Sequence, residues 1–151
     1  MSKKINLLET GNMLLAAQNI VLCCHVSPDG DTLGSALGLA RFLEKAGKKV
    51  TVFADDDINK SLNFIPGIDK VQRPEAGVLV EADLFVVVDA SSFDRVGICN
   101  EVVKAPVLLN IDHHISNTEF ADYLYLDAEA AAAGEIMCDL FEAMGWEYDE
   151  A

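Results

Sequence analysis

Apolar residues along the chain form two kinds of pattern, and the two alternate from one end to the other. Short, nearly unbroken apolar runs predict strands buried on both faces of a sheet, because such strands lose the usual alternation of apolar and polar positions. Apolar residues spaced three or four positions apart predict helices. The expected strands are 19–26, 48–55, 82–90, 106–114 and 123–129. The expected helices are 7–18, 32–45, a weaker one over 93–105, and 129–145, with a turn or broken helix over 61–71.

This alternation predicts a single α/β domain. The repeated order of strand and helix favours an open, mostly parallel sheet with helices on both faces. A length of 151 residues is enough for one domain with a sizeable core. No internal repeat or low-complexity linker divides the sequence, so we expect one folded unit over residues 1–151.

Composition and charge narrow the class of protein. Hydrophobic residues make up 51% of the chain and charged residues 24%, as in a globular protein. The net charge of −14 and the pI near 4.3 argue against attraction to duplex nucleic acid, although bound divalent cations would allow a small phosphorylated substrate. No apolar run approaches the roughly 20 residues that span a bilayer, and no signal peptide is visible. These features predict a cytoplasmic protein that does not bind membranes.

Three of the expected strands end in side chains that can bind metals or move protons. The residues at these strand ends are His25, Asp29 and Asp31, then Asp89, and then Asp112, His113 and His114. The carboxyl ends of neighbouring strands in an open parallel α/β sheet lie at one edge, where ligands bind in a crevice. We therefore expect these acids and histidines to converge, although the first and last are about 90 residues apart in sequence.

Each of these residues also has a purely structural interpretation. Asp31 could cap the helix that follows it, a role that aspartate fills well. Asp89 could accept hydrogen bonds from the backbone of a neighbouring loop, and His25 could be a hydrogen-bonded histidine without a ligand. Adjacent residues of a regular strand point to opposite faces, so His113 and His114 could not both contact one ion from within a strand.

The structural interpretations do not explain the acids as a group. Ionised carboxylates within a few ångströms of one another repel unless cations neutralise them. A mixed set of aspartate and histidine favours Mn²⁺, with Fe²⁺, Co²⁺ or Zn²⁺ as alternatives, over an all-oxygen Ca²⁺ site. Three or four carboxylates would balance two divalent ions, a pairing suited to phosphoester hydrolysis. Other motifs fit poorly, because Ala40 replaces the glutamate that an EF-hand starting at Asp29 needs, and GxGxxG, P-loop, HExxH and GxSxG are absent.

Three motifs in a fixed order carry a resemblance to a known family. HVSPDGDTLGS at 25–35, VVVDAS at 86–91 and IDHH at 111–114 resemble the motifs of the DHH phosphoesterase family. This family includes RecJ-like exonucleases, cyclic-dinucleotide phosphodiesterases, manganese-dependent family II pyrophosphatases and nano-RNases. Within it, the chain looks most like the bacterial nano-RNase/3′-phosphoadenosine 5′-phosphate phosphatases. The resemblance covers nearly the whole chain, since the helix expected at 129–145 also resembles the helix after the family's DHH strand.

The resemblance implies a centre of two divalent ions, with Mn²⁺ as the expected metal. The implied metal ligands are His25 and Asp29 on one ion, Asp31 and His113 on the other, and Asp89 bridging both. The implied catalytic residues are Asp89, Asp112, which would orient a histidine, and His114, which would face the substrate phosphate. Asn117 would join His114 in binding substrate. The resemblance thus gives the two adjacent histidines different roles.

Two features of the family are not found in the sequence. The last metal-ligating aspartate of the family lies on a later strand, within a DTG-like motif, and the chain ends at WEYDEA without it. Asp127 does not stand at that position. The second domain of the family, with a glycine-rich and basic substrate-binding face, is also absent. We therefore expect residues 1–151 to form an N-terminal DHH catalytic domain that is incomplete at its C-terminal end.

The expected function is metal-dependent hydrolysis of short oligonucleotides or 3′-phosphoadenosine 5′-phosphate by the full-length parent protein. On this interpretation the 151-residue chain alone has little or no activity, since it lacks one ligand and the substrate domain. The alternatives are another DHH substrate, such as a cyclic dinucleotide or pyrophosphate, and a non-catalytic module that binds metal and associates, for example as a homodimer. The sequence does not choose among the family's substrates.

Overall fold

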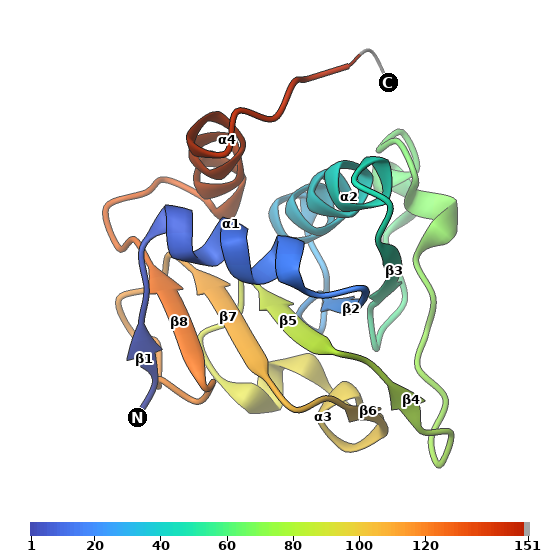
Figure 1. Cartoon of the computed structure of the whole chain (residues 1–151). Coiled ribbons are helices and arrows are strands. Elements are labelled where there is room, and N and C mark those ends of the chain that lie inside the picture. The colour runs from blue at the N-terminus through green and yellow to red at the C-terminus, as the bar shows by residue number, and fades with distance from the viewer. Residues whose placement is uncertain (150–151) are drawn as a thin grey trace.

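The computed structural model describes residues 1–149, so the last two residues of the domain predicted over 1–151 lie outside the described part. A six-stranded sheet forms its centre, in the order β1-β8-β7-β5-β2-β3, and every pair of neighbouring strands is parallel (Figure 1). Its strands are β1 (Lys3–Lys4), β2 (Asn19–Cys23), β3 (Lys49–Phe53), β5 (Leu84–Val88), β7 (Leu108–Asp112) and β8 (Tyr123–Leu126). A separate two-stranded sheet pairs β4 (Val80–Glu81) with β6 (Val103–Lys104).

Helices cover both faces of the large sheet, as predicted, but unequally (Figure 1). The long helices α1 (Leu7–Ala16), α2 (Gly30–Lys45) and α4 (Ala133–Ala143) pack on one face. Among the described residues, the helices on the other face are the 3₁₀ helix η3 (Phe93–Val96) and the short helix α3 (Cys99–Val102). Two further 3₁₀ turns, η1 (Lys60–Leu62) and η2 (Ile68–Lys70), follow β3. No helix in residues 1–149 is long and apolar enough to cross a membrane.

A hydrophobic core lies on each face of the large sheet, and this explains why the sequences of the strands are unbroken apolar runs. In β2, Leu22 packs in the core under the long helices, whereas its neighbour Val21 packs in the core on the opposite face. In β5, Val86 and Val87 divide between the same two cores. Because both faces of these strands exclude water, neither face selects polar residues.

Local hydrogen bonds shift several predicted helix boundaries. The last helix begins at Ala133 rather than 129, because the preceding residues form a turn in which Asp127 Oδ1 accepts from Glu129 N at 3.0 Å. The alanines before it are therefore not helical, in spite of their high helix propensity. The weak helix over 93–105 is divided at Gly97, which has a left-handed φ of 61°.

The strand order creates a crevice at one edge of the sheet. The chain passes from β2 to β3 on one side, and then crosses to β5 on the other side of β2. Cys23, the last residue of β2, is in register with both Phe53 and Val87. The connections that leave the carboxyl ends of β2 and β5 therefore diverge, and ligands of open α/β sheets bind at such a point.

Candidate metal centre

The carboxyl ends of β2, β5 and β7 surround a cavity of about 500 Å³. Six of the predicted site residues line it: His25, Asp29, Asp31, Asp89, His113 and His114. The predicted convergence of these residues is therefore found in the structure. Asp112 and Asn117 are not among the lining residues, and Asp127, in the turn after β8, is not either.

The loop after β2 presents His25 and Asp29 to the cavity. Ser27 adopts a left-handed φ of 51° within this loop, and its backbone N donates to Asp56 Oδ2 at 2.9 Å. The Asp56 pKa is lowered by this hydrogen bond and by a second one from its neighbour's backbone. The acid that follows β3 thus fixes the conformation of the loop that follows β2.

The His25 ring is oriented so that Nε2 faces carboxylates. Its Nδ1 lies 2.6 Å from the Val26 carbonyl, while Nε2 lies 3.5 Å from Asp89 Oδ2 and 3.6 Å from Asp29 Oδ1. Burial lowers the pKa of His25, but the contacts with Asp89, the Val26 carbonyl and Asp29 outweigh burial and leave this pKa raised. Nε2 is therefore the nitrogen available to a ligand in the cavity.

Asp89 lies at the centre of the cluster. Its backbone has a left-handed φ of 62°, which few residues other than glycine adopt, and its side chain is only 4% exposed. Oδ1 lies 3.1 Å from His113 Nε2, yet no hydrogen bond of acceptable geometry from residues 1–149 reaches this buried oxygen. Burial raises the Asp89 pKa; a hydrogen bond from His25 opposes the rise and the Asp31 charge adds to it. A buried carboxylate oxygen without a donor is a site that a cation would satisfy.

Two groups of side chains have the spacing of a metal site, and they share Asp89. In each, one ligand atom per residue lies within 4.8 Å of the others: His25 with Asp29 and Asp89, and Asp89 with His113 and His114. Imidazole nitrogens with carboxylate oxygens suit Mn²⁺, Fe²⁺, Co²⁺ or Zn²⁺. Each group could therefore hold a divalent ion, and Asp89 belongs to both.

Asp31 has a second role that the sequence did not suggest. Its two carboxylate oxygens accept from Ala133 N at 2.9 Å and Gly134 N at 2.8 Å, so Asp31 caps the start of α4. The alternative that Asp31 caps the helix after it is wrong, because Asp29 Oδ1 accepts from Thr32 N at 3.0 Å and is the cap of α2. Asp31 Oδ2 also lies 3.7 Å from His113 Nε2, and each carboxylate oxygen can accept more than one bond.

The DHH segment places its two histidines side by side rather than on opposite faces. β7 ends at Asp112, so His113 and His114 lie beyond the regular strand, and their ring centroids are 4.4 Å apart. Asp112 is fully buried and its Oδ1 lies 2.6 Å from His114 Nδ1. In the structure Asp112 therefore orients His114, with Nε2 of that ring left for the cavity.

Asn117 lies behind this pair. Its Nδ2 donates to Asp112 Oδ2 and to Asn110 Oδ1, both at 2.7 Å, and its Oδ1 accepts from Glu119 N at 2.8 Å. This geometry favours support of Asp112 over the substrate contact that the resemblance implied. Sequence reasoning missed Asn110, which is fully buried and donates to Val87 O and Ala90 O. A polar residue inside the apolar run VLLNI was the available signal.

Ser91 and Arg95 also line the cavity, and neither was predicted. Ser91 follows Asp89 so closely that the strand-end argument could have included it. Arg95 lies in η3, and Nη2 of its guanidinium lies 3.5 Å from His25 Nδ1. No motif spacing marked this arginine, because its position depends on how η3 folds back toward the loop after β2.

Comparisons with known proteins identify the family of the chain. A protein-family model described as the N-terminal domain of the DHH family matches residues 19–151. The chain is 34% identical over 132 residues to a bifunctional oligoribonuclease and PAP phosphatase NrnA of Thermus thermophilus, covering 85% of this chain and 38% of the relative. It is 31% identical over 127 residues to a probable manganese-dependent inorganic pyrophosphatase of an Exiguobacterium species, covering 82% and 40%.

A solved structure shows the same fold. The crystal structure of an exopolyphosphatase-related protein from Bacteroides fragilis superposes with a TM-score of 0.83 at 26% identity, covering 93% of this chain and 44% of that one. The chain thus spans about two fifths of the length of the curated relatives it matches.

Proposed function

This chain belongs to the DHH family, and on that premise we propose that the protein hydrolyses phosphoester bonds in short oligoribonucleotides or in 3′-phosphoadenosine 5′-phosphate, using two divalent ions with Mn²⁺ preferred. The NrnA relative supports this substrate class, and the manganese-dependent pyrophosphatase relative supports the metal. The chain would act as the N-terminal catalytic domain of a longer protein, whose remaining part supplies much of the substrate-binding surface.

One observation carries the proposal: the buried Asp89 carboxylate lies between His25 and His113, with an oxygen that no donor satisfies. A structural aspartate in this position would be expected to have its hydrogen bonds complete. Instead, two groups of ligand atoms, His25 with Asp29 and His113 with His114, meet at Asp89, as expected of a residue that would bridge two ions. We propose Asp31, whose Oδ2 lies 3.7 Å from His113 Nε2, in place of His114 in the second ligand set, which leaves His114 for the substrate. His25, Asp29, Asp31 and His113 would complete the ligand set.

The chain's own residues then have distinct tasks. Bound divalent ions would supply charge neutralisation at the phosphoryl oxygens and a water of lowered pKa. Asp112 holds His114 Nδ1, so that His114 Nε2 would face the substrate. When the ring carries both protons, Nε2 can donate a hydrogen bond to a phosphoryl oxygen or pass its proton to the leaving oxygen. His114 is 42% exposed, which leaves it within reach of a ligand entering from solvent.

The test is hydrolysis by the protein made from its complete reading frame. RNAs of two to five nucleotides, 3′-phosphoadenosine 5′-phosphate and pyrophosphate would be assayed with Mn²⁺, Co²⁺ or Mg²⁺ and with a chelator. We expect release of mononucleotide or phosphate that requires the metal and is lost in Asp89→Asn but retained in Lys70→Ala, a control that also removes one charge, but from the exposed surface. Activity on pyrophosphate alone, or on none of these substrates with any ion, would contradict the proposal.

A further inference from the structure

One wall of the cavity is formed by the segment that follows β5, and it carries a cation among acids. Arg95 is the only lysine or arginine among the described residues that line the cavity. Three carboxylates line the same cavity, those of Asp29, Asp31 and Asp89. An arginine in such surroundings usually pairs with a carboxylate.

The backbone of Arg95 is held firmly against the loop after β2. Its carbonyl accepts from Val26 N at 2.6 Å. Two residues later, Gly97 leaves no room for a Cβ, because Asp55 occupies that space, and Asp55 Oδ2 accepts from Ile98 N at 2.8 Å. The start of the Arg95 side chain is therefore fixed beside His25.

Arg95 is exposed, and no carboxylate accepts from its guanidinium in the described part of the chain. None of the ion pairs found in residues 1–149 includes Arg95, whereas Arg41 and Arg73 each pair with aspartates. Its one side-chain contact is His25 Nδ1 at 3.5 Å, and this nitrogen lies closer, at 2.6 Å, to the Val26 carbonyl. When Nδ1 donates a hydrogen bond to that carbonyl, it cannot also accept a hydrogen bond from Arg95.

From this geometry we propose that Arg95 binds the non-bridging oxygens of the substrate phosphoryl group. The planar guanidinium can donate two parallel N–H bonds to two oxygens of one phosphate, which a lysine cannot do. Arg95 lies beside His25, and His114 lies beside Asp112, with Asp89 between the two histidines. The phosphoryl group would thus lie between Arg95 and His114. This inference rests on the proposed function, since it assigns a residue to the same site.

The experiment measures phosphate binding apart from turnover. Inorganic phosphate is titrated into the Mn²⁺-loaded protein by calorimetry, for the wild type and for Arg95→Gln, Arg95→Lys and Lys70→Ala. The Arg95→Gln variant should bind phosphate on the order of 10- to 100-fold more weakly, the usual effect of losing charged hydrogen bonds. Arg95→Lys should recover only part of the affinity, and Lys70→Ala should match the wild type. The Mn²⁺ titration and melting temperature of each variant show that the site and fold are intact.

Steady-state kinetics give a second measurement. With 3′-phosphoadenosine 5′-phosphate as substrate, Arg95→Gln should raise KM by a factor similar to its loss of phosphate affinity. Phosphate affinity within about twofold of the wild type in Arg95→Gln would overturn the inference, and so would full recovery in Arg95→Lys, which would mean that charge alone matters. A wild-type protein that binds phosphate through Arg95 but hydrolyses nothing would contradict the proposed function and leave the Arg95 assignment standing.

Discussion

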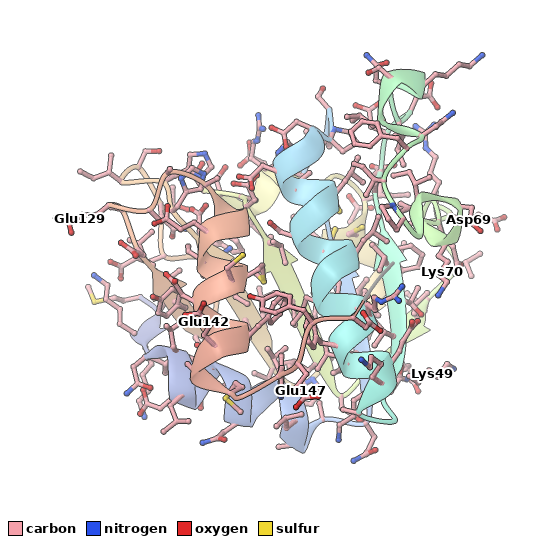
Figure 2. The ribbon with its side chains drawn as sticks, turned by 90° about the horizontal axis from the view of Figure 1, so that it is seen from above. Lys49, Asp69, Lys70, Glu129, Glu142 and Glu147 are labelled. Atoms are coloured by element: carbon pink, nitrogen blue, oxygen red, sulfur yellow. The ribbon has the colours of Figure 1, made fainter. Side chains whose placement is uncertain are left out.

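Two cavities of nearly equal size lie along helix α2, and their chemistry is opposite. The cavity at the carboxyl ends of the strands, of about 500 Å³, is lined by acids, histidines and one arginine. The second, which we call the apolar groove, measures about 470 Å³ and lies between α2, β3 and the segment Ile65–Lys70. Figure 2 labels Asp69 and Lys70 on that segment, on the side of α2 away from α4.

The difference shows that the volume of a cavity does not identify a binding site, whereas buried polar groups without hydrogen-bond partners do. The apolar groove is lined by residues such as Leu37, Val52 and Ile65, and the charged groups at its rim, Glu44 and Lys70, pair with each other at 3.4 Å. In the polar cavity, the buried Asp89 Oδ1 receives no hydrogen bond from the described residues, and no carboxylate among them pairs with the Arg95 guanidinium. The buried Asp89 oxygen of the polar cavity is therefore the group that a bound cation would stabilise.

The largest expected effect is that of Asp89→Asn. Asparagine tolerates the left-handed backbone at this position, so the fold should persist. Metal-dependent hydrolysis should fall by more than the roughly 10- to 100-fold typical of changes around a metal site. In chelator the variant should melt at a higher temperature than the wild type, because a buried carboxylate with a raised pKa is replaced by a neutral amide. If the variant bound Mn²⁺ as tightly as the wild type by calorimetry, Asp89 would not be a metal ligand.

Asp31→Ala should affect both the polar cavity and the start of α4. Without its carboxylate, the Ala133 and Gly134 amides lose their acceptor, which should lower the free energy of unfolding by about 1 kcal/mol. These amides should exchange faster by hydrogen–deuterium exchange, and Mn²⁺ should bind more weakly. Asn6→Ala removes the matching cap of α1 and is the control, with a similar loss of stability but no change in Mn²⁺ affinity.

Asn117→Ala separates support of Asp112 from substrate contact. If Asn117 positions Asp112 and through it His114, then kcat should fall by about tenfold with KM nearly unchanged. If Asn117 binds substrate, KM should rise instead. Steady-state kinetics on 3′-phosphoadenosine 5′-phosphate decide between the two.

A change in the apolar groove should leave the polar cavity untouched. A Cβ at Gly38 would meet no atom within 4 Å, so Gly38→Ala should stabilise α2 by about 0.5–1 kcal/mol. For a protein of this size the melting temperature should rise by roughly 1–4 °C. Mn²⁺ and phosphate affinities should equal those of the wild type; a loss of either would mean that the groove and the cavity are coupled.

The smallest effect concerns the segment after α4, which crosses α2 near the groove (Figure 2). Asp149 pairs with Arg41 and Lys45 of α2, and these contacts lower its pKa to about 2. Its stabilising effect is present above its unfolded pKa of roughly 4 and is lost as pH falls toward 2. Trp146, which stacks on Phe42, should report this release by fluorescence. The Asp149→Asn variant should show no such change in Trp146 fluorescence between these pH values. If the variant and the wild type gave the same fluorescence change with acid, Asp149 would not be the group that releases the segment.

Much of the site could be predicted because strand ends converge in any open parallel sheet. Six residues were predicted from their position after apolar runs, and all six line the cavity: His25, Asp29, Asp31, Asp89, His113 and His114. Arg95 and Asn110 could not be found in the same way. Arg95 reaches the cavity only because η3 folds back toward Val26, and the role of Asn110 depends on its contact with Asn117.

The sequence by itself determined the parallel α/β fold and the types of side chain at the carboxyl edge of the sheet. Both can be recognised locally, because strands buried on both faces are continuous apolar runs and polar residues follow directly where these runs end. Only the tertiary structure decided how the acids divide their tasks. It made Asp29 rather than Asp31 the cap of α2, and it joined Asp31 to α4 over 102 residues of sequence. These assignments depend on distances between segments that meet only in the folded chain, and residue spacing does not encode such distances.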